Sequence, residues 1–245
     1  MSPKKTLATS ARVLKQLSHD HRTLGLLFVV PLVLLGLLAW VYSGNPFMFD
    51  VIGPALLGVF PLVVMFLTTS IATLRERRTG TLERLMIMPV GKLDIILGYA
   101  LSFGLLAVIQ AVLASTVAVH LYGLDVAGPA WFLIVVAVAD ALLGTMLGLL
   151  ASAFARSEFQ AVQFMPAFIL PQFLLCGLLV PVDQLPSVLH FIANCLPLTY
   201  AVDAMNLVAR QSDLTAHMFK DLAVVLAFAL AAVLLGAATL RRKTK

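Results

Sequence analysis

Long uncharged apolar blocks recur along this chain, and they constrain its fold more than any other feature of the sequence. The first block, 24–42, holds 19 residues without a charge, and at about 1.5 Å per helical residue that length crosses a hydrocarbon core of roughly 30 Å. Of the 245 residues, 61% are hydrophobic and 12% are charged, whereas soluble domains have roughly 45–50% and about 25%. The sequence therefore predicts an all-α integral membrane protein and excludes an ordinary soluble domain.

Six blocks are predicted to be membrane-spanning helices, and Pro166 and Pro171 interrupt the fifth of them. The spans are 24–42, 51–74, 95–119, 131–155, 159–179 and 222–240. The outer loops are short and we find no convincing internal repeat, so residues 1–245 are expected to form a single transmembrane domain.

The basic residues lie in the joints between the apolar blocks. With six spans and the N-terminus inside the cell, 15 of the 17 lysines and arginines fall in inner segments, as the positive-inside rule requires. A seventh span over 182–206 would move the basic C-terminus outside, so we prefer six. We expect a multi-pass protein of the bacterial plasma membrane with both termini in the cytoplasm. The net charge of +5 thus reflects topology, and no nucleic-acid partner is expected.

Residues 1–23 are predicted to form an amphipathic helix on the membrane surface. Leu7, Ala11, Leu14 and Leu17 recur at helical spacing among basic side chains, a pattern typical of interfacial helices that contact lipid. A secretory signal is the alternative. It is disfavoured because the apolar run that follows is too long and no clear small-residue cleavage site comes after it.

The segment 180–221 is apolar in places but contains no clean span. Pro181, Pro186, Pro197 and several polar side chains interrupt it, and polar groups inside lipid need partners within the protein. We therefore expect short re-entrant helices at the outer interface, before the last span.

The longest inner joint, 75–92, is predicted to form a short amphipathic helix in the cytosol. Gly80 releases the chain from the second span, Leu82 and Leu85 fall on one face, and Pro89 stops the helix. Such an apolar face either folds back on the membrane or docks into a groove on a soluble partner. The residues alone leave both alternatives open.

This joint resembles the cytoplasmic-loop motif of ABC-2 type transporter permeases, the membrane subunits of one class of ATP-binding-cassette exporters. The resemblance runs from Arg75 through Gly80-Thr81-Leu82-Glu83-Arg84-Leu85 to Pro89-Val90. Two later runs, Leu179 to Pro186 and Leu196-Pro197-Leu198-Thr199-Tyr200-Ala201, are similar to that family's re-entrant outer segment. The number of spans, the N-terminal helix and both motifs occur in the family's order, so the resemblance covers essentially the whole chain.

The resemblance implies six helices per subunit, a second permease subunit in a homodimer or heterodimer, and a loop helix that inserts into a separate soluble ABC ATPase. The segment 1–23 would be the family's connecting helix, also near the ATPase. The coupling residues that the resemblance implies in this sequence are Glu76, Gly80, Thr81, Leu82, Glu83, Leu85 and Pro89.

The implied function is outward transport of an amphipathic or hydrophobic molecule, such as a drug, an antibiotic or a lipid-like compound. The chain itself is expected to be a non-ATPase subunit without a cofactor or metal. Its Gly91-Lys92 pair does not belong to a phosphate-binding loop, because Met86 stands where that loop needs glycine and Leu93 follows the lysine. ATP and Mg²⁺ are therefore expected on the partner subunit.

Asp140 lies near the middle of the fourth span, where an ionised carboxylate is costly unless it faces partners or water. One interpretation is a cation or proton site, which would make the protein an ion-coupled secondary transporter. The other, which the resemblance favours, is a protonated or hydrogen-bonded carboxyl that holds helices together, with Gln110 as a candidate partner. A secondary transporter would also be expected to have paired broken helices in two repeats, which we do not find.

The resemblance further implies that the fifth span lines the translocation path together with the second. The candidate path residues are Phe164, Phe168 and Gln172 of the fifth span and Asp140 of the fourth. Contact with lipid or packing in the core explains such aromatic residues equally well.

The histidines and cysteines provide no catalytic or metal motif. The sequence contains neither His-Glu-x-x-His nor Gly-x-Ser-x-Gly, which disfavours an intramembrane enzyme. His190 could form an outer polar cluster with Asp183 or Asp203, but interface residues satisfied by water explain these side chains more simply. Cys176 and Cys195 are either a disulfide pair or two small apolar residues.

Overall fold

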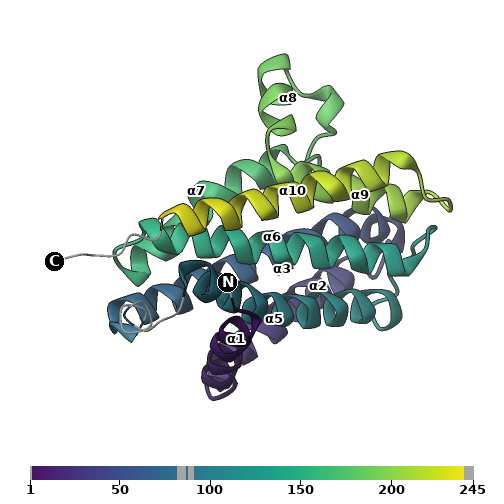
Figure 1. Ribbon diagram of the computed structural model, residues 1–245. Helices are drawn as coiled ribbons and strands as arrows, with labels where there is room; N and C mark the ends of the chain where they lie inside the picture. The colour runs from purple at the N-terminus through teal and green to yellow at the C-terminus, as the bar shows by residue number, and fades with distance from the viewer. Residues whose placement is uncertain (1, 82–86, 88–90, 240–245) are drawn as a thin grey trace.

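The computed structural model describes residues 2–81, 87 and 91–239, and every regular element in these ranges is a helix (Figure 1). The prediction of an all-α protein is confirmed. In chain order the helices are α1 (Pro3–Ser18), α2 (His21–Val41), α3 (Pro46–Arg78), α5 (Lys92–His120), α6 (Ala130–Phe154), α7 (Glu158–Leu175), η1 (Val182–Gln184), α8 (Ser187–Asn194), α9 (Pro197–Arg210) and α10 (Ala216–Thr239).

Five of these helices, α2, α3, α5, α6 and α10, are long and apolar enough to cross a membrane. Helices α8 and α9, bent by 88° at their junction, add a sixth candidate if the pair counts as one span. Helix α7 covers 159–175 of the predicted fifth span, 159–179, but it is not among the five. Its 18 residues include two prolines and three glutamines. The described residues therefore support five to six spans.

The ends of the first two spans follow from local chemistry. The carboxylate of Asp20 caps α2 by accepting a hydrogen bond from the Thr23 amide at 3.1 Å. Helix α3 ends at Arg78, and Gly80 follows with φ at +74°, a left-handed conformation that favours glycine and terminates helices. The prediction that Gly80 releases the chain from the second span is confirmed.

The central helices α3 and α6 approach each other backbone to backbone. A methyl group on Gly144 would lie 2.4 Å from the carbonyl oxygen of Leu62, and one on Gly148 would lie 2.5 Å from that of Phe66. The Gly-x-x-x-Gly spacing is typical of membrane helices that pack closely through small residues. Neither position has room for a larger residue unless the helices move apart.

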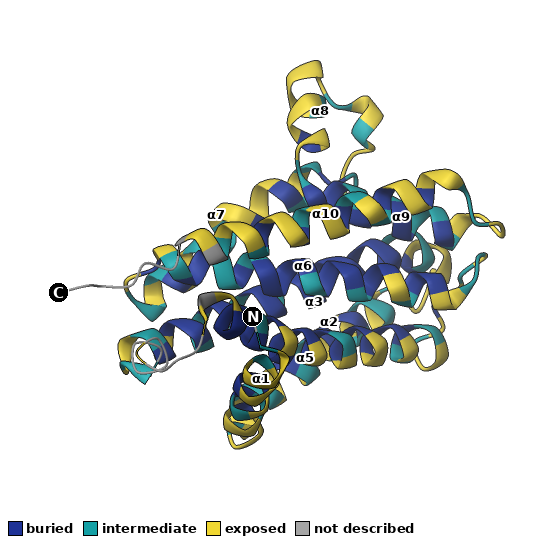
Figure 2. Ribbon diagram, in the orientation of Figure 1, coloured by how far each residue is buried: buried dark blue, intermediate teal, exposed yellow. Residues whose placement is uncertain are grey.

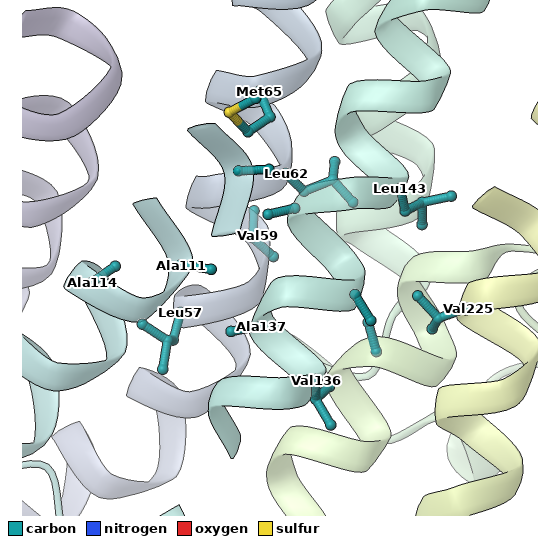
Figure 3. Packing of buried hydrophobic residues seen from close by; sticks show 14 of the residues in the cluster. Leu57, Val59, Leu62, Met65, Ala111, Ala114, Val136, Ala137, Leu143 and Val225 are labelled. Atoms are coloured by element: carbon teal, nitrogen blue, oxygen red, sulfur yellow. The ribbon is translucent and has the colours of Figure 1, made fainter. Parts of the chain in front are cut away.

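Buried aliphatic side chains from four helices pack together in the core of the bundle (Figure 3). Leu57 and Leu62 from α3, Ala111 from α5, Leu143 from α6 and Val225 from α10 are all fully buried. Figure 2 shows the complementary pattern, in which the outward faces of the peripheral helices are exposed. Exposed apolar faces are expected where helices contact lipid.

Helices α1 and α8 depart from the common direction of the bundle (Figure 1). Helix α1 crosses the bundle and packs mainly on α5, whereas α8 projects sideways and is largely exposed (Figure 2). Helix α9 turns back and packs against α3, α6 and α10. We call the end of the bundle where α3 ends and α5 begins the loop end, and the opposite end the far end.

The α3–α6 contact predicts that Gly144→Ala lowers the free energy of unfolding by about 1–3 kcal/mol, because the added methyl meets a backbone oxygen that cannot rotate away. Thermal unfolding of the purified protein in detergent measures this. Gly25→Ala on α2 is the control, since a methyl there meets nothing within 4 Å. Equal stability of Gly144→Ala and wild type would contradict the close packing.

Candidate functional site

A polar cluster joins α1, α3 and α5 at the loop end. The Arg12 guanidinium donates to Glu76 Oε2 at 2.7 Å and to the Tyr99 hydroxyl at 2.9 Å, and the Tyr99 hydroxyl donates to Glu76. The centre of the guanidinium also lies 5.9 Å from the centroid of the Tyr99 ring. Glu76 and Tyr99 are buried, so removal of one partner would leave a buried charge or hydroxyl unpaired.

A second set of hydrogen bonds ties the start of α1 to the first turn of α5. Asp94 Oδ1 accepts from the Ser2 amide at 3.0 Å and from the Thr6 hydroxyl at 3.3 Å. Its Oδ2 accepts from the Gly91 amide at 3.2 Å. The carboxylate thus satisfies backbone donors at the N-termini of two helices, where negative charge is favourable.

Small residues let α1 lie directly on α5. A methyl group on Gly98 would lie 2.7 Å from Thr9 Cβ, and the Ser102 hydroxyl lies 3.0 Å from both the carbonyl and the hydroxyl oxygen of Ser10. Leu7, from the predicted apolar stripe, is 62% exposed. The face that α1 buries against the protein includes Leu17 of that stripe but not Leu7, so it departs from the stripe at the start of the helix.

Helix α1 is therefore bonded to both ends of the 75–92 joint. Arg12 holds Glu76 at its beginning, and Ser2 and Thr6 hold Asp94 just after its end. A force applied to the joint would act on α1, α3 and α5 together.

The structure describes three of the seven predicted coupling residues. Glu76 belongs to the buried cluster and is 5% exposed, Gly80 terminates α3, and the Thr81 hydroxyl lies 3.1 Å from that of Thr79. The predicted coupling residues that lie outside the described residues are Leu82, Glu83, Leu85 and Pro89.

The predicted path residues of α7 have different surroundings. Phe168 is half exposed, and its ring centroid lies 6.4 Å from that of Phe66 on α3 and 6.2 Å from that of Phe164. Gln172 is buried, donates to the Phe168 carbonyl at 2.9 Å and accepts from the Leu198 amide at 3.3 Å. The aromatic side chains thus pack α7 on α3, while Gln172 ties α7 to α9.

Asp140 is fully buried where α6 meets α3 and α9. Its two carboxylate oxygens have no hydrogen-bond partner among the described residues, and a methyl group on Gly58 would lie 3.2 Å from its Oδ2 and 3.0 Å from the Met205 sulfur. Gln110 instead donates to the Leu27 carbonyl at 2.8 Å. The predicted Asp140–Gln110 pair is therefore wrong, because Gln110 faces α2 and Asp140 faces α3.

A cavity of about 450 Å³ lies between α2 and α3 at the loop end, a size typical of small-molecule sites. Apolar residues such as Leu26 and Val64 line most of it, and Asp20 and Arg75 line the polar part. Hydrogen bonds from the Thr23 hydroxyl and amide hold the pKa of the Asp20 carboxyl below its usual range. The cavity therefore combines apolar walls with a charged rim.

Two further predictions from the sequence concern the outer segment. Both cysteines are free thiols, Cys176 buried and Cys195 exposed, so the disulfide alternative is not realised. His190 Nδ1 lies 3.0 Å from the Val182 carbonyl oxygen, whereas Asp203 pairs with a histidine of α10. The predicted His190–Asp203 cluster is therefore wrong, because α8 projects away from α9.

The sequence matches a known protein family. The family model described as "ABC-2 type transporter" matches residues 5–208. The chain belongs to the ABC-2 type transporter family. This match confirms the resemblance carried by the joint and the outer segment. An ABC-2 membrane domain is typically the non-catalytic subunit of its transporter, and ATP binding is expected on a separate subunit.

Curated relatives of this ABC-2 chain include two bacterial permeases and a eukaryotic transporter. The probable multidrug ABC transporter permease YbhR of Escherichia coli (strain K12) is 27% identical over 150 residues, 61% of this chain and 41% of the relative. The linearmycin resistance permease protein LnrN of Bacillus subtilis (strain 168) is 26% identical over 156 residues, 64% of this chain and 40% of the relative. ABC transporter G family member 20 of Dictyostelium discoideum is 27% identical over 165 residues, 66% of this chain and 23% of the relative. The matches thus span less than half the length of each relative.

Arg12 and Tyr99 of the loop-end cluster were not identified from the sequence. An arginine in an interfacial helix and a tyrosine near the start of a span both have ordinary interfacial explanations. One signal was present, because Glu76 is an acidic residue within a basic run at the end of an apolar helix and such a residue needs a cationic partner.

The cluster predicts that Glu76→Gln lowers the free energy of unfolding by about 1.5–3 kcal/mol, because Arg12 and Tyr99 lose a charged hydrogen-bond partner. Glu158→Gln is the matched control, since it breaks an exposed ion pair in which Arg75 donates two hydrogen bonds to Glu158, at 2.9 and 3.0 Å. This control should lower the free energy of unfolding by less than about 1 kcal/mol. Thermal unfolding in detergent measures both variants. If the two substitutions cost the same, the loop-end cluster does not stabilise the ABC-2 chain more than a surface pair does.

Proposed function

We propose that this ABC-2 chain is the membrane permease subunit of an ATP-binding-cassette exporter, which moves an amphipathic or hydrophobic molecule outward using ATP hydrolysed by a separate soluble ATPase. The attachment of α1 to both ends of the 75–92 joint carries the proposal. A joint braced in this way can pass a displacement to three helices at once, which is what a subunit driven by an external motor requires.

In this proposal the joint is the docking element for the ATPase. The sequence predicts a short helix here with Leu82 and Leu85 on its apolar face, Thr81 and Glu83 beside that face and Pro89 at its end. Glu76 acts from within the chain, because its bond to Arg12 couples any movement of the joint to α1.

The proposed substrate is a drug-like, antibiotic-like or lipid-like amphipath. The cavity between α2 and α3 supports this, since its apolar walls suit a hydrophobic body and its rim, with Asp20 and Arg75, suits a polar head. Two relatives are named a probable multidrug permease and a linearmycin resistance permease, which supports the same class of substrate.

We further propose the assembly in the membrane. The chain has six spans, with α7 as the fifth, both termini in the cytoplasm of a bacterial cell, and a second permease subunit as its partner. Phe164 and Phe168 of α7 line the path between the two subunits together with α3, while Asp140 and Gln172 brace the wall behind them.

Asp140 supports a second candidate, an ion-coupled secondary transporter. A fully buried carboxyl whose oxygens lack hydrogen-bond partners among the described residues is a default candidate for ion or proton transport within a membrane. In the exporter it is instead a protonated carboxyl packed against Gly58, and the two proposals differ in what happens when it is replaced.

Leu85→Asp is expected to abolish coupling, because a charge on the apolar face of the joint should prevent docking. We expect the tagged wild-type protein to recover a soluble ATP-hydrolysing subunit from native membranes in gentle detergent, and Leu85→Asp to reach the membrane normally but lose that subunit. Leu121→Asp is the control, since Leu121 is an exposed leucine at the far end. Recovery of the same ATPase with Leu85→Asp would refute the docking role of the joint. Recovery of the wild-type chain alone, without ATP hydrolysis, would refute the exporter function.

Asp140→Asn distinguishes the two candidates. If the chain is an exporter subunit, the complex in liposomes should transport an amphipathic dye with ATP and without an ion gradient, and Asp140→Asn should leave that transport unchanged. Transport driven by a proton or sodium gradient in the absence of ATP, abolished by Asp140→Asn, would establish the secondary transporter instead.

A further inference from the structure

One histidine and two aspartates meet toward the far end, where α9 packs on the first turns of α10. His217 Nε2 lies 3.0 Å from Asp203 Oδ2 and 3.2 Å from Asp221 Oδ2. One ligand atom from each residue lies within 4.8 Å of those of the other two. Asp203 comes from α9, and His217 and Asp221 follow each other at i, i+4 on one face of α10.

The three side chains do not satisfy one another. A ring nitrogen carries one hydrogen at most, and His217 Nε2 is hydrogen-bonded to Asp203. Asp221 is 1% exposed, and its Oδ2, although near the same nitrogen, has no hydrogen-bond partner among the described residues. A buried carboxylate that faces His217 at 3.2 Å without a hydrogen bond is costly unless a cation, either a metal ion or a protonated His217, compensates it.

We propose that Asp203, His217 and Asp221 bind a divalent transition-metal cation of the Zn²⁺ type. One imidazole nitrogen and two carboxylate oxygens form a ligand set that Zn²⁺ accepts in proteins, with a fourth position for water. Ligands about 2.0–2.1 Å from a tetrahedral zinc are separated by about 3.3–3.4 Å. The distances of 3.0 and 3.2 Å from His217 to the two carboxylates come close to this spacing, so only small side-chain movements are needed.

The surroundings of the cluster allow an ion to enter and be retained. The side chains of Asp203 and His217 are about half exposed, at 48% and 57%, whereas that of Asp221 is 2% exposed, so the site has an open side and a buried anchor. The adjacent Phe219 stacks edge-on against Phe132, at 5.1 Å between ring centroids, and Phe132 against Trp131 at 5.6 Å. Such an aromatic group with an exposed tryptophan is typical of the membrane interface, where the ion can exchange with water.

A metal at this position would join the re-entrant segment to the last span. Helix α9 packs against α3, α6 and α10, and the ion would add a direct bond between α9 and α10. The site lies away from the loop end and shares no residue with the joint or the cavity, so it does not depend on the proposed function.

The test uses the full chain, purified in detergent and stripped with a chelator, and titrated with ZnCl2 alone. We expect one saturable Zn²⁺ per chain by calorimetry, an increase in Tm with Zn²⁺, and a visible absorption band when Co²⁺ replaces it. His217→Ala and Asp203→Asn should lose all three signals. Both side chains are about half exposed, so these variants are expected to fold.

Matched controls separate this site from adventitious binding. Asp213→Asn removes an exposed carboxylate from the loop between α9 and α10, and His120→Ala removes an exposed histidine at the far end; both should keep the Zn²⁺ binding and the Tm shift. Absence of saturable binding in the wild type, or binding by His217→Ala equal to that of the wild type, would overturn the proposal.

Discussion

The backbone contact between α3 and α6 is the constraint on which the rest of the bundle depends. Apolar side chains gain little by leaving lipid for a protein core, so helices in a membrane associate through close packing. Gly144 and Gly148 allow it because they have no side chain of their own to hold the backbone of α6 away from that of α3. Helices α5, α9 and α10 then pack around this pair, and α3 and α6 hold the polar groups in place. Asp140 lies one turn before Gly144, and Glu76 lies at the loop end of α3.

Buried polar residues of this chain fall into two groups with different consequences. Glu76, Gln110 and Gln172 have partners on other helices, and each ties two or more elements together, as polar residues in membrane bundles commonly do. Asp140 and Asp221 have carboxylate oxygens without hydrogen-bond partners in the described part of the chain. Several buried hydroxyls and Gln110 Oε1 also lack a partner there, but an unpaired buried carboxylate is far more costly. Asp140 and Asp221 are therefore where an ion, a proton or a ligand is to be sought.

The parts of the fold that the sequence predicted are those set by local properties. Helix positions follow from the length of apolar blocks, the end of α3 follows from Gly80, and the family follows from motifs in a fixed order. Contacts between helices were not predicted, because periodicity shows which residues share a face but not which helix that face meets. Gln110 and Asp140 both lie inside predicted spans, the third and the fourth, yet Gln110 donates to the Leu27 carbonyl of α2 instead of to Asp140. Arg12 lies 64 residues from Glu76, and no local pattern connects them.

Helix α3 runs from the loop-end cluster toward the far end of the bundle. Its 33 residues extend about 50 Å at 1.5 Å per residue, which is well beyond a hydrocarbon core of roughly 30 Å. The excess length places Glu76 beyond the hydrocarbon, where its ion pair with Arg12 avoids the cost of a charge in lipid. Toward the far end the same helix packs against α9. Since α3 packs along α6 and against α9, a displacement of the joint at one end would be passed on to α9, which packs on α10. A metal that bonds α9 to α10 would oppose that displacement, and the far end is thus where the proposed transport movement would meet resistance.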